Sequence, residues 1–215
     1  MAAPGPSLLG AVRSIVDSHL PVIVVGDAWR ALPSADVLYA ADNHWWEHYE
    51  GVPQFAGEKW TTHQSTPHEQ HGNDKTNLAK SYGLHLVLGD DHCEGFSLDP
   101  FRIAHGSNSG FQAINLAILF GCKVIVLCGF DMHGTTHFFG DHPEAVMSEK
   151  RQRERDFSRF VKYFARAVST VPDDVSIINA TPGSALRCFR QMDFVNALEH
   201  CRLYRNGAES YRIAG

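Results

Sequence analysis

The sequence lacks the marks of several protein classes. Its five cysteines form no CxxC pair and are odd in number, which disfavours both a disulfide scaffold and a cysteine-based zinc site. No apolar run approaches the roughly 20 residues that a membrane-spanning helix needs, and no basic region precedes an apolar stretch at the N-terminus. Neither a membrane span nor a secretory signal is therefore predicted, and a reducing cytoplasm is the expected location. The cysteines are Cys93, Cys122, Cys128, Cys188 and Cys201.

Strong positive charge is also absent. Lys and Arg total 19 against 24 Asp and Glu, for a net charge of -5, which argues against a protein that coats nucleic-acid phosphates. With 44% hydrophobic and 20% charged residues, the chain has an ordinary globular composition. Its 215 residues predict one domain, residues 1–215, which is large enough to be stable without a disulfide or a metal. Histidine is abundant, with 13 copies.

Strand-like and helix-like patterns alternate along the chain. Short apolar runs that end near glycine or a polar residue indicate buried parallel strands, and apolar residues at three- and four-residue spacing indicate helices. This alternation predicts an α/β fold with a single doubly wound, Rossmann-like, mostly parallel sheet and helices on both faces. Strands are expected at residues 21–26, 36–41, 54–62, 84–88, 123–128 and 175–178, and helices at residues 7–20, 44–49, 109–120, 148–168 and 192–204.

Long polar segments separate several of these elements. Residues 61–80 are rich in His, Gln and Asn and are expected to form a flexible lid, and residues 89–107 and 132–146 are expected to be long loops. Residues 207–215 are expected to form a tail.

Polar residues gather where the predicted strands end. In a doubly wound sheet, ligands bind outside the carboxyl ends of the strands, near the point where the strand order reverses. These residues therefore predict one edge of a binding site. Turns also favour Asp, Asn and Gly, so a purely structural role stays open. The residues are Gly26, Asp27, Asp42, Asn43, Asp131, Asn179 and Thr181, with residues 89–91.

A run of small residues opens the predicted central helix. Gly106, Ser107, Asn108, Ser109 and Gly110 would let a ligand approach the backbone, and free N–H groups at a helix start attract phosphate or another anion. The run is neither a Walker loop nor a GxGxxG fingerprint, which disfavours a P-loop kinase and a standard NAD site. A serine that caps the helix is the structural alternative.

Residues 105–131, HGSNSGFQAINLAILFGCKVIVLCGFD, resemble the block SGxxAxxLAxxxGxKxIxLxGxD. That block is shared by the family-42 bacterial sialyltransferases and by the DUF115 group of MptE-like 6-hydroxymethylpterin diphosphokinases. The chain also looks like small proteins encoded in tailed-phage and prophage genomes. Residues 22–43 and 179–186 are similar to the flanking strand and small-residue turn of the sialyltransferases.

The resemblance implies a transferase that binds a nucleotide or nucleotide-sugar donor. Gly26 and Asp27 would face its phosphate or ribose, Asn43 its base or phosphate, and Asp131 the ribose or the transferred group. The acceptor would be a glycan, a modified nucleic-acid base or a small molecule. If the chain is phage-encoded, it would act in the host cytoplasm. The rest of the predicted donor site is Asp42, Ser107, Asn108, Ser109, Gly110, Asn179 and Thr181.

Sugar transfer needs a base that deprotonates the acceptor and groups that stabilise the departing phosphate. The predicted base is His142, with Asp141 orienting its imidazole, since a neutral imidazole titrates near physiological pH. Asp131 completes the predicted catalytic set. An ordinary histidine of a surface loop is the alternative. Candidate cations for the leaving group are Lys59, Arg102 and Arg30.

A divalent metal would compete for the same loop. Asp131, His133, His137, Asp141 and His142 supply nitrogen and oxygen ligands within twelve residues. A diphosphokinase would instead hold Mg²⁺ through carboxylates such as Asp42 or Asp131. We expect no metal, because residues 134–136 break any helical spacing of the histidines.

The aromatic residues Trp45, Trp46, His48 and Tyr49 follow the second predicted strand. They would either stack on a nucleobase or sugar or pack in the core. The leading prediction is a nucleotide-sugar-dependent glycosyltransferase without a membrane partner. An MptE-like diphosphokinase that uses ATP and Mg²⁺ is the second. A non-catalytic phage accessory protein that binds a nucleotide or a host protein is the third, and a homo-oligomer stays open.

Overall fold

The computed structural model of the chain describes residues 1–63, 75–90, 95–134, 136–140 and 150–213. The helices are α1 (Leu8–Ser18), α2 (Asn43–His48), α3 (Thr76–Tyr82), α4 (Ser109–Leu119), α5 (Lys150–Ala167) and α6 (Phe194–Ile213), with short 3₁₀ helices η1 (Gly26–Arg30) and η2 (Val168–Thr170). The strands are β1 (Ile23–Val25), β2 (Val37–Tyr39), β3 (Glu58–Thr62), β4 (His85–Asp90), β5 (Arg102–Ala104), β6 (Val124–Leu127), β7 (Ser176–Asn179) and β8 (Arg190–Gln191).

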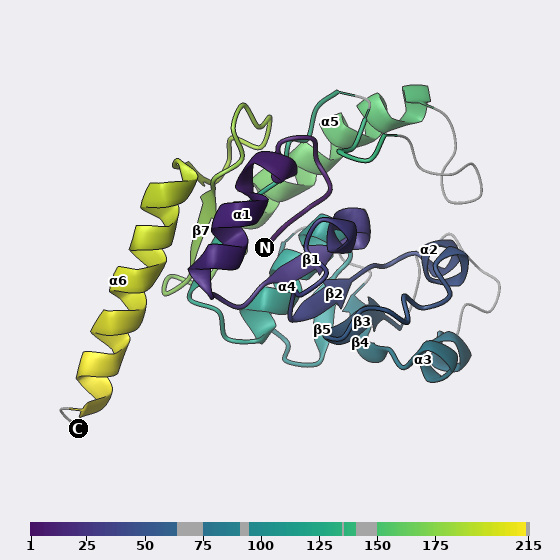
Figure 1. The fold of residues 1–215 in the computed structure, drawn as a ribbon, viewed down its shortest axis with the longest axis horizontal. Helices are drawn as coiled ribbons and strands as arrows, with labels where there is room; N and C mark the ends of the chain where they lie inside the picture. Colours follow the sequence, from purple (N-terminus) through teal and green to yellow (C-terminus); the bar gives the residue numbers. More distant parts are fainter. Residues whose placement is uncertain (64–74, 91–94, 135, 141–149, 214–215) are drawn as a thin grey trace.

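Each described strand runs parallel to its neighbours. One sheet has the order β1-β2-β3-β4-β5, and a second has the order β6-β7-β8. The arrangement, with helices around a parallel sheet, confirms the predicted Rossmann-like α/β class (Figure 1). After β5 the strand order reverses, because α4 carries the chain back across the sheet to β6, on the other side of β1.

The first residues of the chain join the two sheets. Ala2 forms parallel bridges with Val24 of β1 and with Cys128, directly after β6. Its amide donates to a β1 carbonyl, and the Ala3 amide donates to the Cys128 carbonyl, both at 2.9 Å. Residues 1–3 thus act as a parallel strand between β1 and β6. The sequence does not predict this strand, because Met-Ala-Ala-Pro-Gly-Pro has neither β-branched residues nor alternation.

Helices cover both faces of the sheets, and strand residues alternate between the two. Ile23 and Val25 pack on the face covered by α4 and α5, whereas Val24 packs on the face of α1, α2, α3 and α6. The helix α4 is buried from Gly110 to Ile118. It is therefore the central helix of the fold, and its position determines where the strand order reverses.

The predicted lid contains regular structure at both of its ends. Residues 61–62 belong to β3 and residues 76–82 form α3, so the prediction of a continuous loop at 61–80 is wrong there. Residues 64–74 lie outside the described part of the chain. The long loop predicted at 89–107 contains β5. Both missed elements are short, and a segment of three to seven residues is too short to show a clear hydrophobic period.

The predicted tail is also helical for most of its length. The helix α6 continues to Ile213, through Asn206 and Gly207, a pair that usually signals a helix end. The sequence does not predict strand β8, because two residues are too few to show a hydrophobic period. Although α6 has 20 residues, no helix in the described part of the chain is both long and apolar enough to cross a bilayer.

Two glycines allow the N-terminal strand to lie against the loop after β6. A Cβ on Gly5 would lie 1.9 Å from Oδ2 of Asp131 and 2.3 Å from the carbonyl oxygen of Gly129. A Cβ on Gly129, whose φ is +73°, would lie 2.1 Å from the carbonyl oxygen of Ala3. Any larger residue at either position would force these backbones apart.

We therefore expect Gly5→Ala to lower the free energy of unfolding by about 1–3 kcal/mol, because the added methyl group overpacks this contact. The matched control is Gly10→Ala in α1, where a Cβ meets nothing within 4 Å. That change should raise stability by up to about 1 kcal/mol through helix propensity. Urea denaturation of both variants measures the difference. Equal stability of the Gly5 variant and the wild type would contradict the tight contact.

Candidate functional site

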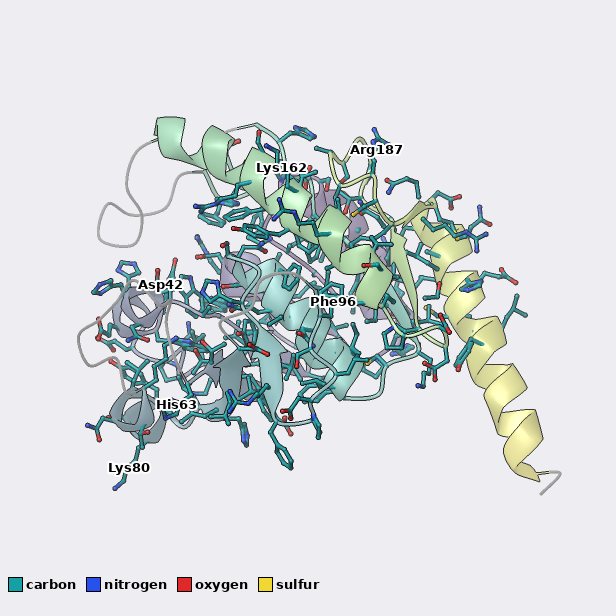
Figure 2. All side chains as sticks on the ribbon, turned by 180° about the vertical axis from the view of Figure 1, so that it is seen from behind. Asp42, His63, Lys80, Phe96, Lys162 and Arg187 are labelled. Carbon is teal, nitrogen blue, oxygen red and sulfur yellow. The ribbon has the colours of Figure 1, made fainter. Side chains whose placement is uncertain are left out.

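The carboxyl ends of the parallel strands meet at one edge of the molecule, and α4 begins there. The amide of Ala41, just after β2, donates to Oγ of Ser109 at 3.1 Å, which holds the end of β2 against the first turn of α4. Asp131 follows β6 at the same edge. Figure 2 shows Asp42 and His63 toward one end of the molecule, with the helices that follow β2 and precede β4. The structure thus brings the predicted edge residues of β2, β6 and α4 together.

The start of α4 is capped by Asn108. Its Oδ1 accepts from the Phe111 amide at 2.8 Å, and its Nδ2 donates to the Gly106 carbonyl at 3.0 Å. The structural alternative of a serine cap is therefore wrong, since the neighbouring Asn108 has the extended backbone of a cap residue. Gly106 and Ser107 precede it with φ values of +51° and +59°. Their conformation turns the chain sharply from β5 into the helix.

Two amides in the first turn of α4 have no acceptor within the described part of the chain. Among the described residues, none accepts a hydrogen bond from the amides of Ser109 and Gly110, which point out of the helix as the first amides of any helix do. A Cβ on Gly110 would lie 3.0 Å from the Phe130 ring and 3.1 Å from Oδ1 of Asn108. The glycine lets α4 approach the loop after β6, and this end of the helix can hold an anion.

Two polar residues follow β2: Asp42 caps α2, and Asn43 has a side-chain oxygen without a hydrogen-bond donor in the described chain. Asp42 is exposed and caps α2, because its carboxylate accepts from the His44 amide at 2.8 Å. Asn43 follows it, and its Oδ1 is buried without a hydrogen-bond partner in the described part of the chain. A buried acceptor without a donor is costly. A ligand with an N–H or O–H group would satisfy it.

Asp27 is fully buried and committed to internal contacts. Its carboxylate accepts hydrogen bonds from Nε1 of Trp45 at 2.8 Å and from the Tyr49 hydroxyl, and lies 3.8 Å from Nη1 of Arg30. These bonds fasten α2 to η1. Gly26 supplies the positive φ, +48°, that begins the turn. The two adjacent tryptophans of α2 are buried, so these aromatic residues pack in the core.

Asp131 is likewise used to position another element. It is 7% exposed, its Oδ1 accepts from the Ser7 amide at 3.3 Å, and its Oδ2 accepts from the Ser7 hydroxyl at 2.8 Å. Both carboxylate oxygens therefore hold the start of α1, where an anion also complements the helix dipole. This carboxylate ties the N-terminal strand to the loop after β6.

Asn179 and Thr181 form a buried network in the turn after β7. Nδ2 of Asn179 donates to Oγ of Ser184 and to the Leu186 carbonyl, both at 2.9 Å. Oγ1 of Thr181 accepts from the Phe130 amide at 3.0 Å. These side chains connect the β7 turn to the β6 loop. Asn179 is 1% exposed and Thr181 is 4% exposed. Both side chains therefore hold the loops of the edge in place and are not accessible to a ligand.

The structure adds a buried cation that sequence reasoning missed. Lys75 is fully buried, and its Nζ donates to the Ala41 carbonyl and to Oγ1 of Thr62 at 3.3 Å. Its ammonium therefore contacts the carbonyl of Ala41, the residue whose amide donates to Ser109. A single lysine within a polar segment carries no sequence signal. Only its burial distinguishes it.

Two further buried side chains hold the loops around α4. Oε1 of Gln112 accepts from the Tyr39 hydroxyl at 2.8 Å, and Oδ1 of Asn115 accepts from the Ser97 and Ala104 amides, each at 2.8 Å. Polar residues on one side of an otherwise apolar helix were the available signal for both. They position the segments before α4 and so the site itself.

The cations predicted to face a leaving group are all engaged elsewhere. Lys59 donates to two backbone carbonyls, Gly51 at 2.9 Å and Tyr82 at 2.7 Å, and burial lowers its pKa. Arg102 lies 3.7 Å from Asp99. Arg30 pairs with the buried carboxylate described above and lies over the Phe139 ring.

The predicted base lies outside the described residues. His142 and Asp141 fall in residues 141–149, of which nothing is described. His133 is exposed, and His137 stacks on the Phe139 ring. Within the described ranges, no group of three or more His, Cys, Asp or Glu side chains could hold a metal ion.

Comparison with known proteins finds no matching family model, curated protein or solved structure. The candidate site therefore rests on its own geometry: the two unpaired amides of α4, the buried acceptor of Asn43 and the buried ammonium of Lys75. Together they form a positively polarised backbone edge next to an unsatisfied acceptor. Such an edge is suited to a phosphate joined to a group with hydrogen-bond donors.

The phenol of Tyr49 makes the stability of the fold sensitive to alkaline pH. Burial, followed by the hydrogen bond and charge of Asp27, raises the pKa of Tyr49 well above its ordinary value of about 10. The folded state therefore keeps a proton that the unfolded state loses, so stability falls as pH rises above about 10. We expect the free energy of unfolding to fall less between pH 9 and 11 in Tyr49→Phe than in the wild type. Urea unfolding across that range measures it, and equal slopes would contradict the assignment.

Proposed function

We propose that the protein is a nucleotide-dependent transferase, and specifically a glycosyltransferase that uses a nucleotide-sugar donor. The observation that carries the proposal is the pair of unpaired amides, those of Ser109 and Gly110, at the reversal point of a parallel sheet. Ligands of doubly wound sheets bind at that point. A donor diphosphate or monophosphate would accept from both amides and lie along the dipole of α4.

Electrostatics at this edge favour an anion. The Lys75 ammonium and the Ser109 hydroxyl both contact the backbone of Ala41, the first at its carbonyl and the second at its amide. A buried charge acts with less screening than an exposed one. The carboxylates of Asp27 and Asp131 are each already paired with protein donors. Their hydrogen bonds offset part of the repulsion that an unpaired carboxylate would exert on a phosphate.

The Asn43 side chain would recognise the rest of the donor. Its buried Oδ1 needs a hydrogen-bond donor, and a nucleobase amino group or a ribose hydroxyl supplies one. The sequence resemblance assigns Asn43 to the base or phosphate of the nucleotide. An unsatisfied acceptor fits the base more readily than the phosphate, which at neutral pH offers few donors of its own.

A diphosphokinase fits the described residues less well. It would hold Mg²⁺ through carboxylates such as Asp42 or Asp131. Both oxygens of Asp131 accept from Ser7, and Asp42 caps α2. A metal ion at either position would compete with a helix start, so we place sugar transfer first.

In the proposed reaction the acceptor hydroxyl oxygen attacks the anomeric carbon, and the bond from that carbon to the donor phosphate breaks. The imidazole of His142 would take the acceptor proton, and Asp141 would orient the ring. The Ser109 and Gly110 amides would stabilise the negative charge that develops on the departing phosphate. The base and the anion site would thus come from different segments of the chain.

The first test is a thermal-shift panel of CMP, UDP, GDP, ATP and their sugar derivatives, each with Mg²⁺ and with EDTA. At 100 times its dissociation constant, a nucleotide should stabilise the fold by about 2.7 kcal/mol, or roughly 5–10 °C for a domain of this size. We expect a response to a pyrimidine nucleotide that is equal in EDTA. A response to ATP that requires Mg²⁺ would favour the diphosphokinase over the glycosyltransferase. A panel without any response would contradict both functions.

Ser107→Asp tests the position of the phosphate without disturbing the helix. Aspartate tolerates the positive φ of this residue, and a negative charge near a helix start stabilises the fold by about 0.3–1 kcal/mol. The same charge should repel a phosphate and weaken nucleotide affinity by about tenfold or more. Ser34→Asp, an exposed residue before β2, is the matched control. Titration calorimetry that gives equal affinities for the two variants would place the nucleotide elsewhere.

His142→Asn tests the base separately from the binding site. We expect this variant to keep its nucleotide affinity and to lose sugar transfer by about 100-fold or more, the usual contribution of a general base. Donor hydrolysis and transfer to a mixed panel of glycans and nucleosides give the readout. Retained transfer in His142→Asn would assign proton removal to another group.

A further inference from the structure

A cavity of about 780 Å³ opens at the amino ends of the strands, opposite the candidate donor site. Its walls come from the end of α1, the end of α4, the N-terminal strand, β6 and the first half of α6. Figure 1 shows α6 along one flank of the molecule, with its far end extending beyond the body. The apolar wall includes Ile15, Ala117, Phe120, Val126, Phe194 and Leu198.

Four charged or hydroxyl groups of this wall are paired within the protein, and one of them is the Met1 ammonium, which donates to the Val126 carbonyl at 2.7 Å. Oγ of Ser18 donates to the Ile15 carbonyl at 2.6 Å, and Oδ2 of Asp36 accepts from the Val22 amide at 2.7 Å. The Lys123 ammonium pairs with Asp174 at the rim. A charged ligand would therefore compete with an internal partner at each of these groups, and burial disfavours the charged form of the Met1 amine by lowering its pKa.

Three thiols complete the wall, and they are uncharged near neutral pH. Burial raises the pKa of Cys128 to about 11 and raises the pKa values of Cys122 and Cys201 above their ordinary range. Protonated thiols behave as small apolar groups. Near neutral pH the cavity lining is therefore polarisable but carries no thiolate.

We propose that this cavity binds an uncharged, predominantly hydrocarbon small molecule. Its volume lies within the range of about 300–1,000 Å³ that small-molecule sites occupy, and an apolar lining with few polar groups is typical of such sites. Affinity would come from apolar area removed from water, about 25 cal/mol per Å². A charged head group would lose its hydration, and wall groups that are already hydrogen-bonded within the protein would replace little of it.

The site is independent of the proposed donor site. The two lie at opposite ends of α4, whose 11 residues span about 16 Å. Ala117 and Phe120 line the cavity, whereas Ser109 begins the helix at the other edge. Loss of one binding activity would leave the other measurable.

The test uses the full chain and the uncharged dye N-phenylnaphthylamine, whose emission rises in apolar surroundings. Competitors are decanol, decanoate and decyltrimethylammonium, which share a chain and differ in charge. We expect decanol to displace the dye at least about tenfold better than either ion. Equal displacement by all three would overturn the uncharged ligand class, and absence of dye binding would overturn the site.

Cys201→Trp should place an indole in the cavity and weaken dye binding by about tenfold or more, because the ligand and the side chain need the same space. Leu203→Trp is the matched control on the same helix, since Leu203 is 63% exposed and outside the lining. Retained binding in the first variant, or equal losses in both, would contradict the assignment.

A measurement on the wild type does not depend on any variant folding. Decanol should slow N-ethylmaleimide labelling of Cys122 and Cys201 several-fold, as followed by peptide mass, and leave Cys188 unaffected because it lies outside the lining. Uniform slowing of all three thiols would indicate a general effect and overturn the site. A dimer whose Cys201 is protected without decanol would assign the cavity to a second copy of the chain instead.

Discussion

The rest of the structure depends on the pairing of the N-terminal strand between β1 and β6. Ala2 bridges Val24 on one side and Cys128 on the other, so a segment of three residues closes what would otherwise be two unpaired sheet edges in the centre of the fold. Buried peptide groups must be hydrogen-bonded, and these strands have no other partner on those sides in the described chain. Small residues are required there, because the adjoining backbones pass within a few ångströms of Gly5 and Gly129. The strand also determines where α1 begins, since Ser7 follows it immediately and is held by Asp131.

Hydrogen bonds within the protein also determine the character of the candidate site. Most polar side chains at the carboxyl edge are used to hold loops: Asp27 fastens α2, Asp131 fastens α1, and Asn179 fastens the turn after β7. What remains for a ligand is largely backbone, the amides at the start of α4, together with the buried acceptor of Asn43. Backbone donors bind a phosphate without discriminating the rest of the molecule. Specificity for a base, a sugar or an acceptor must then come from the few side chains that are not so engaged.

The helix α4 connects two regions of opposite chemistry. Its first turn presents amides to an edge that also contains the Lys75 ammonium, whereas its last turn forms one wall of an apolar cavity. The strands between them are short and buried, so the two regions share a rigid element but no side chain. The polar edge at one end of the sheet and the apolar cavity at the other follow from the direction of α4 and from the space that β6 and α6 enclose between them.

The sequence alone determined the order of most strands and helices, the parallel α/β class, and the small-residue start of α4, because each depends on local periodicity or on residues adjacent in the chain. It also located the polar strand ends, such as Asp42 and Asp131, without indicating what their side chains contact. Tertiary structure decided the rest. The N-terminal strand, the burial of Lys75, the pairing of Ser7 with Asp131 and that of Asp27 with Trp45 all join residues distant in sequence. No local pattern encodes such contacts, since they exist only once the sheet has brought its separate segments to one edge.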